Sequence, residues 1–133
     1  MNHKRHEKLE KIIFKKESYE LQGVIFEVYR KMGSGFLEAV YQECLEKEFE
    51  LRNIPFQSQA EITLSYKYIP LKQTYKADFV CYDLILIEIK AVSEISDTHK
   101  AQLLNYLKAT RYKLGLLVNF SSYPKVGIER IVL

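Results

Sequence analysis

The feature that most constrains the fold is a nearly continuous apolar run from Leu84 to Ile89, which contains Glu88 and is followed directly by Lys90. Such a run is typical of a strand that helices cover on both faces. It therefore predicts a central strand of an α/β domain. Because side chains alternate along a strand, Leu86, Glu88 and Lys90 share one face, and both charges meet the same cleft.

The other segments change period along the chain. Ser18 is a suitable N-cap for a first helix that Gly33 and Gly35 end, and Asp97 can cap a later helix. Tyr75, Ala77 and Phe79 alternate with polar residues, which predicts one strand face. We expect an α/β/α sandwich around a central mixed sheet in the order ααβββαββ, with helices at 18–32, 36–52 and 98–110 and strands at 62–66, 75–80, 84–89, 114–120 and 128–133.

Composition fits one ordinary globular domain of 133 residues, with 47% hydrophobic and 28% charged residues. We expect a basic leader at 1–17, since residues 1–16 hold six Lys or Arg, and a single domain at 18–133. No stretch is apolar enough for a signal peptide or a membrane span, so a cytoplasmic protein without membrane contact is expected. Two cysteines without a partner motif are expected to be buried free thiols.

Asp78 lies on the predicted strand that comes directly before the apolar run. A hairpin with the odd loop Tyr82-Asp83-Leu84 would set Asp78 opposite Glu88, whereas an even loop would place them on opposite faces. Two carboxylates about 5 Å apart repel by roughly 3 kcal/mol at an effective dielectric of ~20. A divalent cation turns that repulsion into affinity, and oxygen ligands favour Mg²⁺ or Mn²⁺.

Each of these charged or polar residues also has a plain structural interpretation. Glu88 and Lys90 could form a salt bridge near a strand end. Glu38, early in the second helix, could be there simply because an acid complements the helix dipole. His99, Gln102 and Tyr106 share one face of the third helix, which could be solvated, although all three side chains can reach a phosphate.

Together these residues resemble the GxxExxY family, a member of the RecB-like branch of the PD-(D/E)XK nuclease superfamily. The resemblance extends from about Tyr19 to Ile131 and implies a restriction-endonuclease-like fold. The segments that carry it are Gly35-x-x-Glu38-x-x-Tyr41, Ala77-Asp78-Phe79, Ile87-Glu88-Ile89-Lys90-Ala91, His99-x-x-Gln102 with Tyr106, and Gly115-Leu116-Leu117-Val118-Asn119-Phe120.

The resemblance also implies roles for particular residues. Asp78, Glu88 and the Ile89 main-chain oxygen would bind a metal ion, and Lys90 would be the catalytic lysine. Gln102 and Tyr106 would organise that lysine and the scissile phosphate. Glu38 looks like the first-helix acid of this branch. The chain departs from the family at Arg111, where glycine is usual, so the third helix must end without glycine's conformational freedom.

The expected activity is therefore Mg²⁺-dependent (or Mn²⁺-dependent) hydrolysis of phosphodiester bonds in nucleic acid, with DNA as the expected substrate. One alternative is a nuclease fold that binds nucleic acid or protein without cutting. Another is a small interaction subunit that uses exposed aromatics such as Tyr66, Tyr68 and Tyr75. A homodimer or a larger protein partner is also expected, because one small domain has few elements to enclose a duplex.

Overall fold

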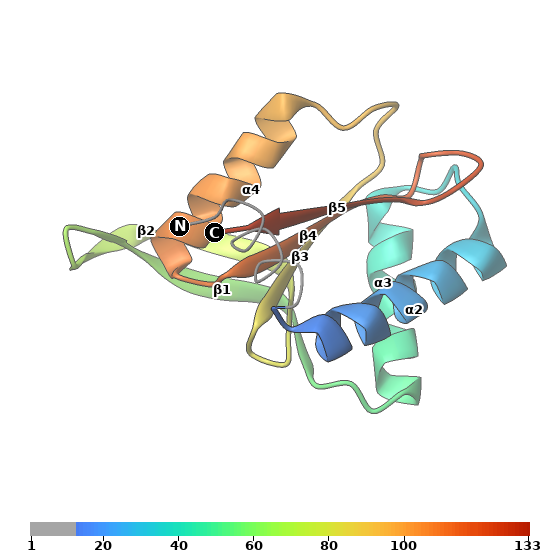
Figure 1. Cartoon of the computed structure of the whole chain (residues 1–133), viewed down its shortest axis with the longest axis horizontal. Coiled ribbons are helices and arrows are strands. Elements are labelled where there is room, and N and C mark those ends of the chain that lie inside the picture. The colour runs from blue at the N-terminus through green and yellow to red at the C-terminus, as the bar shows by residue number, and fades with distance from the viewer. Residues whose placement is uncertain (1–12) are drawn as a thin grey trace, which may run out of the picture.

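The structure, a computed structural model, describes residues 13–133, so most of the expected leader lies outside the described part of the chain. Helices and strands follow in the expected order, ααβββαββ (Figure 1). The elements are α2 (Lys15–Met32), α3 (Glu38–Leu51), β1 (Phe56–Tyr66), β2 (Ile69–Cys81), β3 (Ile85–Lys90), α4 (Asp97–Thr110), β4 (Leu114–Asn119) and β5 (Gly127–Val132).

One mixed sheet in the order β1-β2-β3-β4-β5 organises the fold. All neighbouring strands are antiparallel except β3 and β4, which run parallel. A parallel pair needs a crossover, and α4 supplies it by covering one face of the sheet. Helices α2 and α3 cover the other face (Figure 1). The expected α/β sandwich with a central mixed sheet is confirmed.

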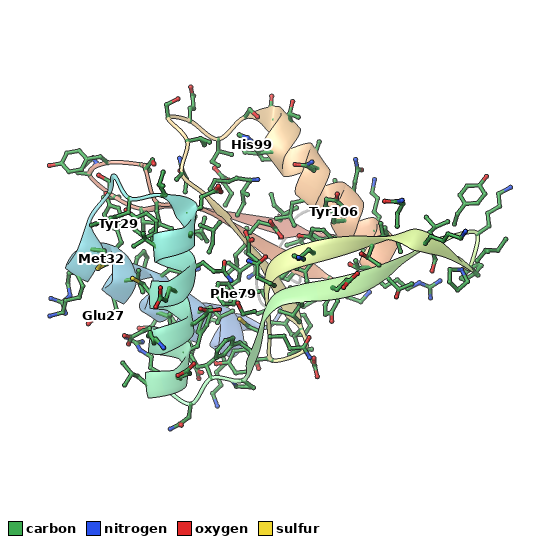
Figure 2. The ribbon with its side chains drawn as sticks, turned by 180° about the vertical axis from the view of Figure 1, so that it is seen from behind. Glu27, Tyr29, Met32, Phe79, His99 and Tyr106 are labelled. Atoms are coloured by element: carbon green, nitrogen blue, oxygen red, sulfur yellow. The ribbon has the colours of Figure 1, made fainter. Side chains whose placement is uncertain are left out.

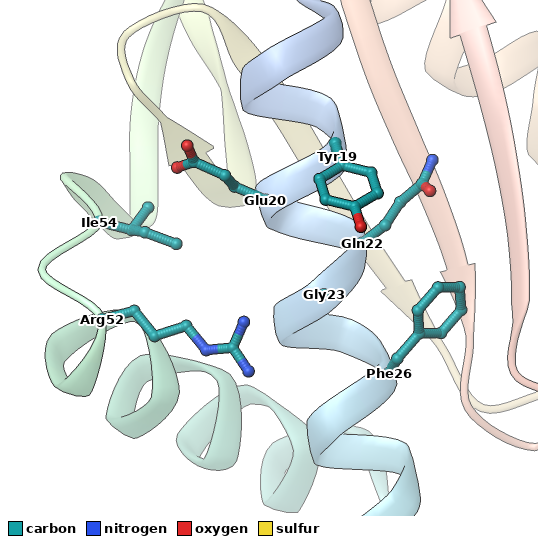
Figure 3. A pocket seen from close by; sticks show the side chains of 7 residues that line it. All are labelled: Tyr19, Glu20, Gln22, Gly23, Phe26, Arg52 and Ile54. Atoms are coloured by element: carbon teal, nitrogen blue, oxygen red, sulfur yellow. The ribbon is translucent and has the colours of Figure 1, made fainter.

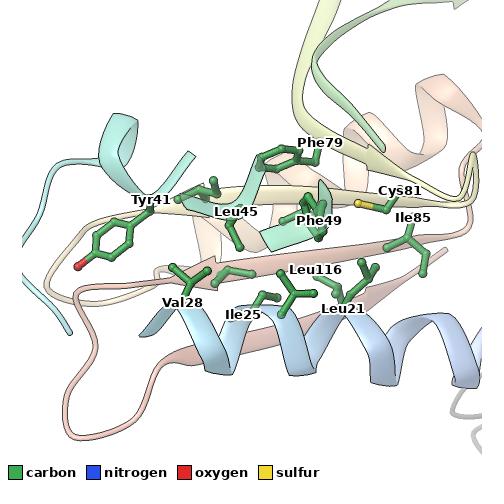
Figure 4. Close-up of a cluster of buried hydrophobic side chains, with 14 of the residues drawn as sticks. Leu21, Ile25, Val28, Tyr41, Leu45, Phe49, Phe79, Cys81, Ile85 and Leu116 are labelled. Atoms are coloured by element: carbon green, nitrogen blue, oxygen red, sulfur yellow. The ribbon is translucent and has the colours of Figure 1, made fainter. Parts of the chain in front are cut away.

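The larger of two apolar clusters lies between the sheet and the α2–α3 pair (Figure 4). Phe49 of α3 is fully buried there, with its ring centroid 5.1 Å from that of Phe79 and 5.2 Å from that of Phe56. The smaller cluster, on the α4 face, is built on Leu103 and Leu107. Because β3 contributes side chains to both clusters, its expected central position is confirmed.

The first helix begins at Lys15 rather than after Ser18, so the N-cap role expected for Ser18 is wrong. Phe14 occupies the N-cap position with φ 51° and provides no side-chain cap. Ser18 is instead buried in the first turn, where its hydroxyl accepts a hydrogen bond of 3.1 Å from Arg130 of β5. A tertiary contact thus replaces the expected local one.

The glycine turn between α2 and α3 ends the first helix as expected. Gly33 and Gly35 have φ of 74° and 110°, which residues with a side chain rarely adopt. Tyr41 holds this turn by donating its hydroxyl to the Gly33 carbonyl, while its ring stacks on Phe120. Leu37 is the N-cap of α3 and is 79% exposed.

Helix α4 differs from the expectation at its start. Ser96, not Asp97, is the N-cap, and its side chain accepts the His99 N–H while His99 Nδ1 accepts the Ser96 N–H. Asp97 falls in the first turn, where an acid complements the helix dipole. At the other end, Arg111 itself adopts the left-handed conformation, with φ 69°, that glycine usually supplies.

Both cysteines are free thiols, and Cys81 is buried as expected, whereas Cys44 is only half-buried. Within residues 13–133, none of the helices has the length and apolar character that crossing a membrane requires.

We predict that Phe49→Ala lowers the free energy of unfolding by about 3–5 kcal/mol, because it leaves a cavity among packed aromatic rings. Leu51→Ala on the same helix, where the side chain is 77% exposed, should change it by less than about 0.5 kcal/mol. Urea unfolding followed by circular dichroism measures both. Equal effects of the two substitutions would contradict this description of the core.

Candidate functional site

The acidic pair depends on the turn between β2 and β3. Tyr82 and Asp83 both have positive φ, and the Leu84 N–H donates to the Cys81 carbonyl, which closes a three-residue connection. Cys81 then pairs with Ile85, and the register continues to Phe79 opposite Ile87. Continued by one residue, this register would set Asp78 opposite Glu88, as the odd loop required. The strands separate at this point, and a hydrogen bond from the Asp78 N–H to the Glu88 carboxylate links the two residues.

The alternation of β2 breaks at Asp78. Phe79 packs on the α2–α3 face, but Ala77 packs on the α4 face, although the two are separated by a single residue. The expectation that both share one face is therefore wrong. Gln59 on the neighbouring strand β1 has φ 53° at the matching position, so the irregularity spans both strands. Beyond it, β2 separates from β3, whose last pair with it is Phe79 with Ile87.

The two carboxylates take over hydrogen bonding where β2 leaves β3. Asp78 Oδ2 accepts the Ile89 N–H at 2.7 Å, and Glu88 Oε1 accepts the Asp78 N–H at 3.3 Å. Each carboxylate is thus fixed by a backbone donor that the diverging strands leave available. Gln59 adds a weak side-chain contact of 3.4 Å to Asp78.

Tyr75 completes the surroundings of Glu88. Its hydroxyl donates to Glu88 Oε1, and its ring stacks on Tyr106 of α4 with centroids 3.8 Å apart and planes 9° from parallel. Burial and the adjacent Glu88 charge raise the pKa of Tyr75, which keeps it a proton donor. The phenol therefore orients Oε1 of Glu88.

The pKa of Glu88 is raised from its ordinary 4.5 to about 7. Burial is the main cause and the charge of Asp78 is the second, and they outweigh the hydrogen bonds from Tyr75 and the Asp78 N–H. Two adjacent carboxylates that resist ionising together fit a divalent cation, which would offset their repulsion.

Lys90 and the polar side chains of α4 lie together beside this pair. Glu88, Lys90, Gln102 and Tyr106, together with His99, line a small cavity of about 20 Å³. Figure 2 shows His99 and Tyr106 along α4. Glu88 lines the same small cavity as these two residues. The structure thus brings the helix strip next to the strand charges that the sequence singled out.

The main chain of Lys90 is held from two sides. Its carbonyl accepts the Phe120 N–H at 3.0 Å. Next to it, the Asn119 side chain accepts from the Val92 N–H at 3.1 Å and donates to the Val92 carbonyl at 2.9 Å. Asn119 is buried, and its two hydrogen bonds connect the loop after β3 to the end of β4. The backbone of Lys90 is therefore held in place.

Of the two α3 residues Glu38 and Gln42, Gln42 contacts Asp78, whereas Glu38 does not join the acidic pair in a cluster of three carboxylates within residues 13–133. Glu38 is exposed at the first position of α3. One turn later, Gln42 donates to the Asp78 carbonyl at 3.1 Å and to the Ser58 hydroxyl at 2.8 Å. Sequence reasoning missed Gln42. Its spacing of four residues from Glu38, which puts both on one helix face, was the available signal.

The arrangement offers two carboxylates and a main-chain oxygen for a cation. Among residues 13–133, no cluster of three or more His, Cys, Asp or Glu side chains is close enough to bind a metal ion. Asp78, Glu88 and the Ile89 carbonyl, which is on β3 between Glu88 and Lys90, are therefore the oxygen donors that this site provides. All three are oxygens, the ligand type of Mg²⁺ and Mn²⁺.

A larger groove of about 500 Å³ lies between α2 and α3 (Figure 3). Its lining includes exposed Tyr19 and Phe26 and the guanidinium of Arg52. Glu20 is the one carboxylate in this lining, so the groove lacks the paired acids found on the other face. It offers a surface for contact but no comparable chemistry.

Comparisons with known proteins agree with this geometry. A family model described as the PD-(D/E)XK nuclease superfamily matches residues 15–131. A solved structure described as the crystal structure of SSO0001 is similar in fold, with a TM-score of 0.55 and 23% sequence identity. The similarity covers 92% of this chain and 61% of that one, so this chain spans less than two thirds of the length of its structural relative. No curated protein matches the chain.

We predict that Glu88→Gln stabilises the metal-free protein above pH 7. Between about pH 4.5 and 7, folded Glu88 holds a proton that the unfolded chain has released, so the stability of the wild type falls as pH rises through this window. The glutamine removes this effect, which is on the order of 3 kcal/mol at pH 8. Urea unfolding in EDTA at pH 5 and pH 8 measures it.

Glu50→Gln, a change at an exposed acid on α3, is the matched control and should follow the wild-type pH dependence. If the Glu88 variant keeps the same pH dependence as the wild type, the raised pKa is wrong.

Proposed function

Since the chain belongs to the PD-(D/E)XK nuclease superfamily, we propose that it is a metal-dependent nuclease with its active centre at Asp78, Glu88 and Lys90. The observation that carries this proposal is the acidic pair itself. Two carboxylates lie together at the strand divergence, half-buried and raising the pKa of Glu88. A protein that only needed a stable sheet would gain from replacing them, because buried like charges oppose folding.

Asp78, Glu88 and the Ile89 carbonyl would hold Mg²⁺ or Mn²⁺. Glu38 is left out of this ligand set, because within residues 13–133 it does not join the two acids in a cluster of three carboxylates. When bound, such an ion lowers the pKa of a water and neutralises charge on the phosphate. The chain's own part is to fix the ligands, and the Ile89 N–H and Tyr75 hydroxyl do so for Asp78 and Glu88 respectively. Oriented ligands of this kind need no rearrangement when the cation enters.

Lys90 would bind and orient the scissile phosphate or the attacking water. It shares a strand face with Glu88, and pairing with β4 fixes its backbone, so its side chain extends from an immobile main chain. A charged ammonium beside a phosphate acts by positioning and by stabilising negative charge rather than by removing a proton. Gln102 and Tyr106 would contact the same phosphate and lysine from α4, with Tyr106 held by its stack on Tyr75.

Finer assignments form part of the same proposal. We place the chain in the GxxExxY family of the RecB-like branch, on the segments quoted above. DNA is the proposed substrate, and the cytoplasm the proposed location. Residues 1–17 remain a proposed basic leader and 18–133 a proposed single domain. A homodimer or a larger protein partner would help enclose a duplex.

We predict that the purified chain cleaves nucleic acid in Mg²⁺ or Mn²⁺ and that cleavage stops in EDTA. Glu88→Gln and Lys90→Met should each lower the rate at least about 100-fold, because each removes charge next to the reacting phosphate. Glu50→Gln should leave the rate unchanged. A panel of labelled single- and double-stranded DNA and RNA at pH 6–9 tests this, and intact substrates throughout would rule out the nuclease.

We also predict that Mg²⁺ or Mn²⁺ raises the melting temperature, because an ion that binds only the folded chain stabilises it. At an ion concentration 100 times the dissociation constant, the gain is about 2.7 kcal/mol. The increase should disappear in Asp78→Asn and in Glu88→Gln but persist in Glu50→Gln. Scanning calorimetry measures it, and an equal increase in all variants would place the ion elsewhere.

A further inference from the structure

The β1–β2 hairpin continues past the rest of the sheet as a two-stranded arm. Strand β2 pairs with β3 only over Phe79–Cys81, whereas its pairing with β1 runs on to Tyr66 opposite Ile69. Figure 2 shows this arm extending beyond the helices. Its base includes Tyr75, which lies in the acidic site, so the arm leads directly away from the candidate active centre.

The tip of the arm exposes large apolar and aromatic side chains. Tyr66 is 61% exposed, Tyr68 is 83% exposed and Ile69 is 62% exposed. They are adjacent to one another across the turn, so they form one patch rather than scattered residues. Clustered exposed aromatics of this kind mark a contact surface.

The turn at the tip of the arm contains residues that rarely adopt its left-handed backbone conformation. Lys67 and Tyr68 occupy its two central positions with φ of 48° and 67°. Two-residue hairpin turns with positive φ at both positions strongly favour Asn-Gly, because a side chain there costs about 1–2 kcal/mol per residue. Turn stability therefore does not explain a lysine and a tyrosine at these positions, but a role for their side chains does.

Beyond Glu61, which lies on β1 opposite Lys76, the arm and the end of α4 that contacts it carry only basic charge. From Ile62 to Ala77 the chain has three lysines and no acidic residue, and 98–128 also has none. The Arg111 guanidinium lies 4.9 Å from the centroid of the Tyr68 ring, and the Lys67 ammonium lies 5.5 Å from that of Tyr66. Each ring thus combines an open face with a neighbouring cation, and the patch attracts a polyanion.

We propose that the hairpin tip, defined as Tyr66–Ile69, is a base-stacking site for single-stranded nucleic acid. Exposed aromatic rings among cations bind unpaired bases by stacking and the backbone by charge. Paired bases in a duplex hide the faces that the rings need. The proposal takes the polymer from the proposed function, but the site is separate from the acidic pair.

The distance between the hairpin tip and the acidic site would allow one nucleic-acid strand to contact both. Tyr68 and Tyr75 are seven positions apart in the sequence, a span of about 23 Å at 3.3 Å per residue of extended strand. At 3.4 Å per stacked nucleotide, this corresponds to about seven nucleotides. A strand whose phosphate lies beside Lys90 therefore reaches the tip within one short oligonucleotide.

The test measures binding of the full chain in EDTA, so no cleavage contributes. Fluorescence anisotropy compares a labelled single strand of 20 thymidines with a 20-base-pair duplex. A Tyr66→Ala, Tyr68→Ala double variant should raise the Kd for the single strand about tenfold or more, since stacking contributes about 1–3 kcal/mol per base. The matching double phenylalanine variant should stay within about twofold, because phenylalanine also stacks.

Tyr19→Ala is the matched control. This tyrosine is 78% exposed but lies on α2, across the sheet from α4, and its loss should leave the Kd unchanged. An unchanged Kd in the double alanine variant overturns the proposal, as does an equal loss for the duplex. A change in oligomeric state by sedimentation with unchanged binding would assign the tip to a second copy of the chain instead.

A second measurement does not depend on any variant. Ultraviolet crosslinking of the wild type to an oligonucleotide containing 5-iododeoxyuridine should attach the label to Tyr66 or Tyr68, as read by peptide mass spectrometry. Labels confined to other peptides overturn the proposal. Glu88→Gln separates this proposal from the nuclease, since it should lose cleavage yet keep tip-dependent binding in EDTA.

Discussion

The bond from the Ile89 N–H to the Asp78 carboxylate is the interaction on which the site depends. It forms where β2 leaves β3, so a side chain replaces a strand partner at the divergence. The same divergence frees the Asp78 N–H for Glu88. A regular sheet would satisfy these donors with backbone carbonyls and leave the acids no fixed position. The irregularity therefore both opens the sheet and orients its two carboxylates.

Much of this arrangement was predictable, because it follows from the odd number of residues in the β2–β3 turn and from the alternation of side chains along a strand. An odd turn had to place Asp78 opposite Glu88, and the apolar run before Lys90 had to be central. The break at Asp78 was not predictable, since Ala77 and Phe79 read as one face until Gln59 is seen in a left-handed conformation. Local rules cannot report an irregularity shared by two strands.

The roles of two side chains, Ser18 and Gln42, differ from what the sequence predicts for a common reason. Ser18 resembles a cap by sequence, but Arg130, more than a hundred residues away, takes its hydroxyl into the core. Gln42 resembles one more solvated helix residue until Asp78 and Ser58 are folded against it. In each case a long-range partner decided the role of a side chain whose own neighbours in sequence were uninformative.

The parallel pairing of β3 with β4 has a consequence for how the chain folds. Strands β1, β2 and β3 are joined by short turns, so the acidic pair forms from contacts close in sequence. The α4 side chains join it only after the long crossover to β4 closes, and non-local closure is slow. The two halves of the site thus differ in the sequence separation of the contacts that assemble them. One hairpin turn brings the carboxylates together, whereas the α4 side chains reach them through the long-range pairing of β3 with β4.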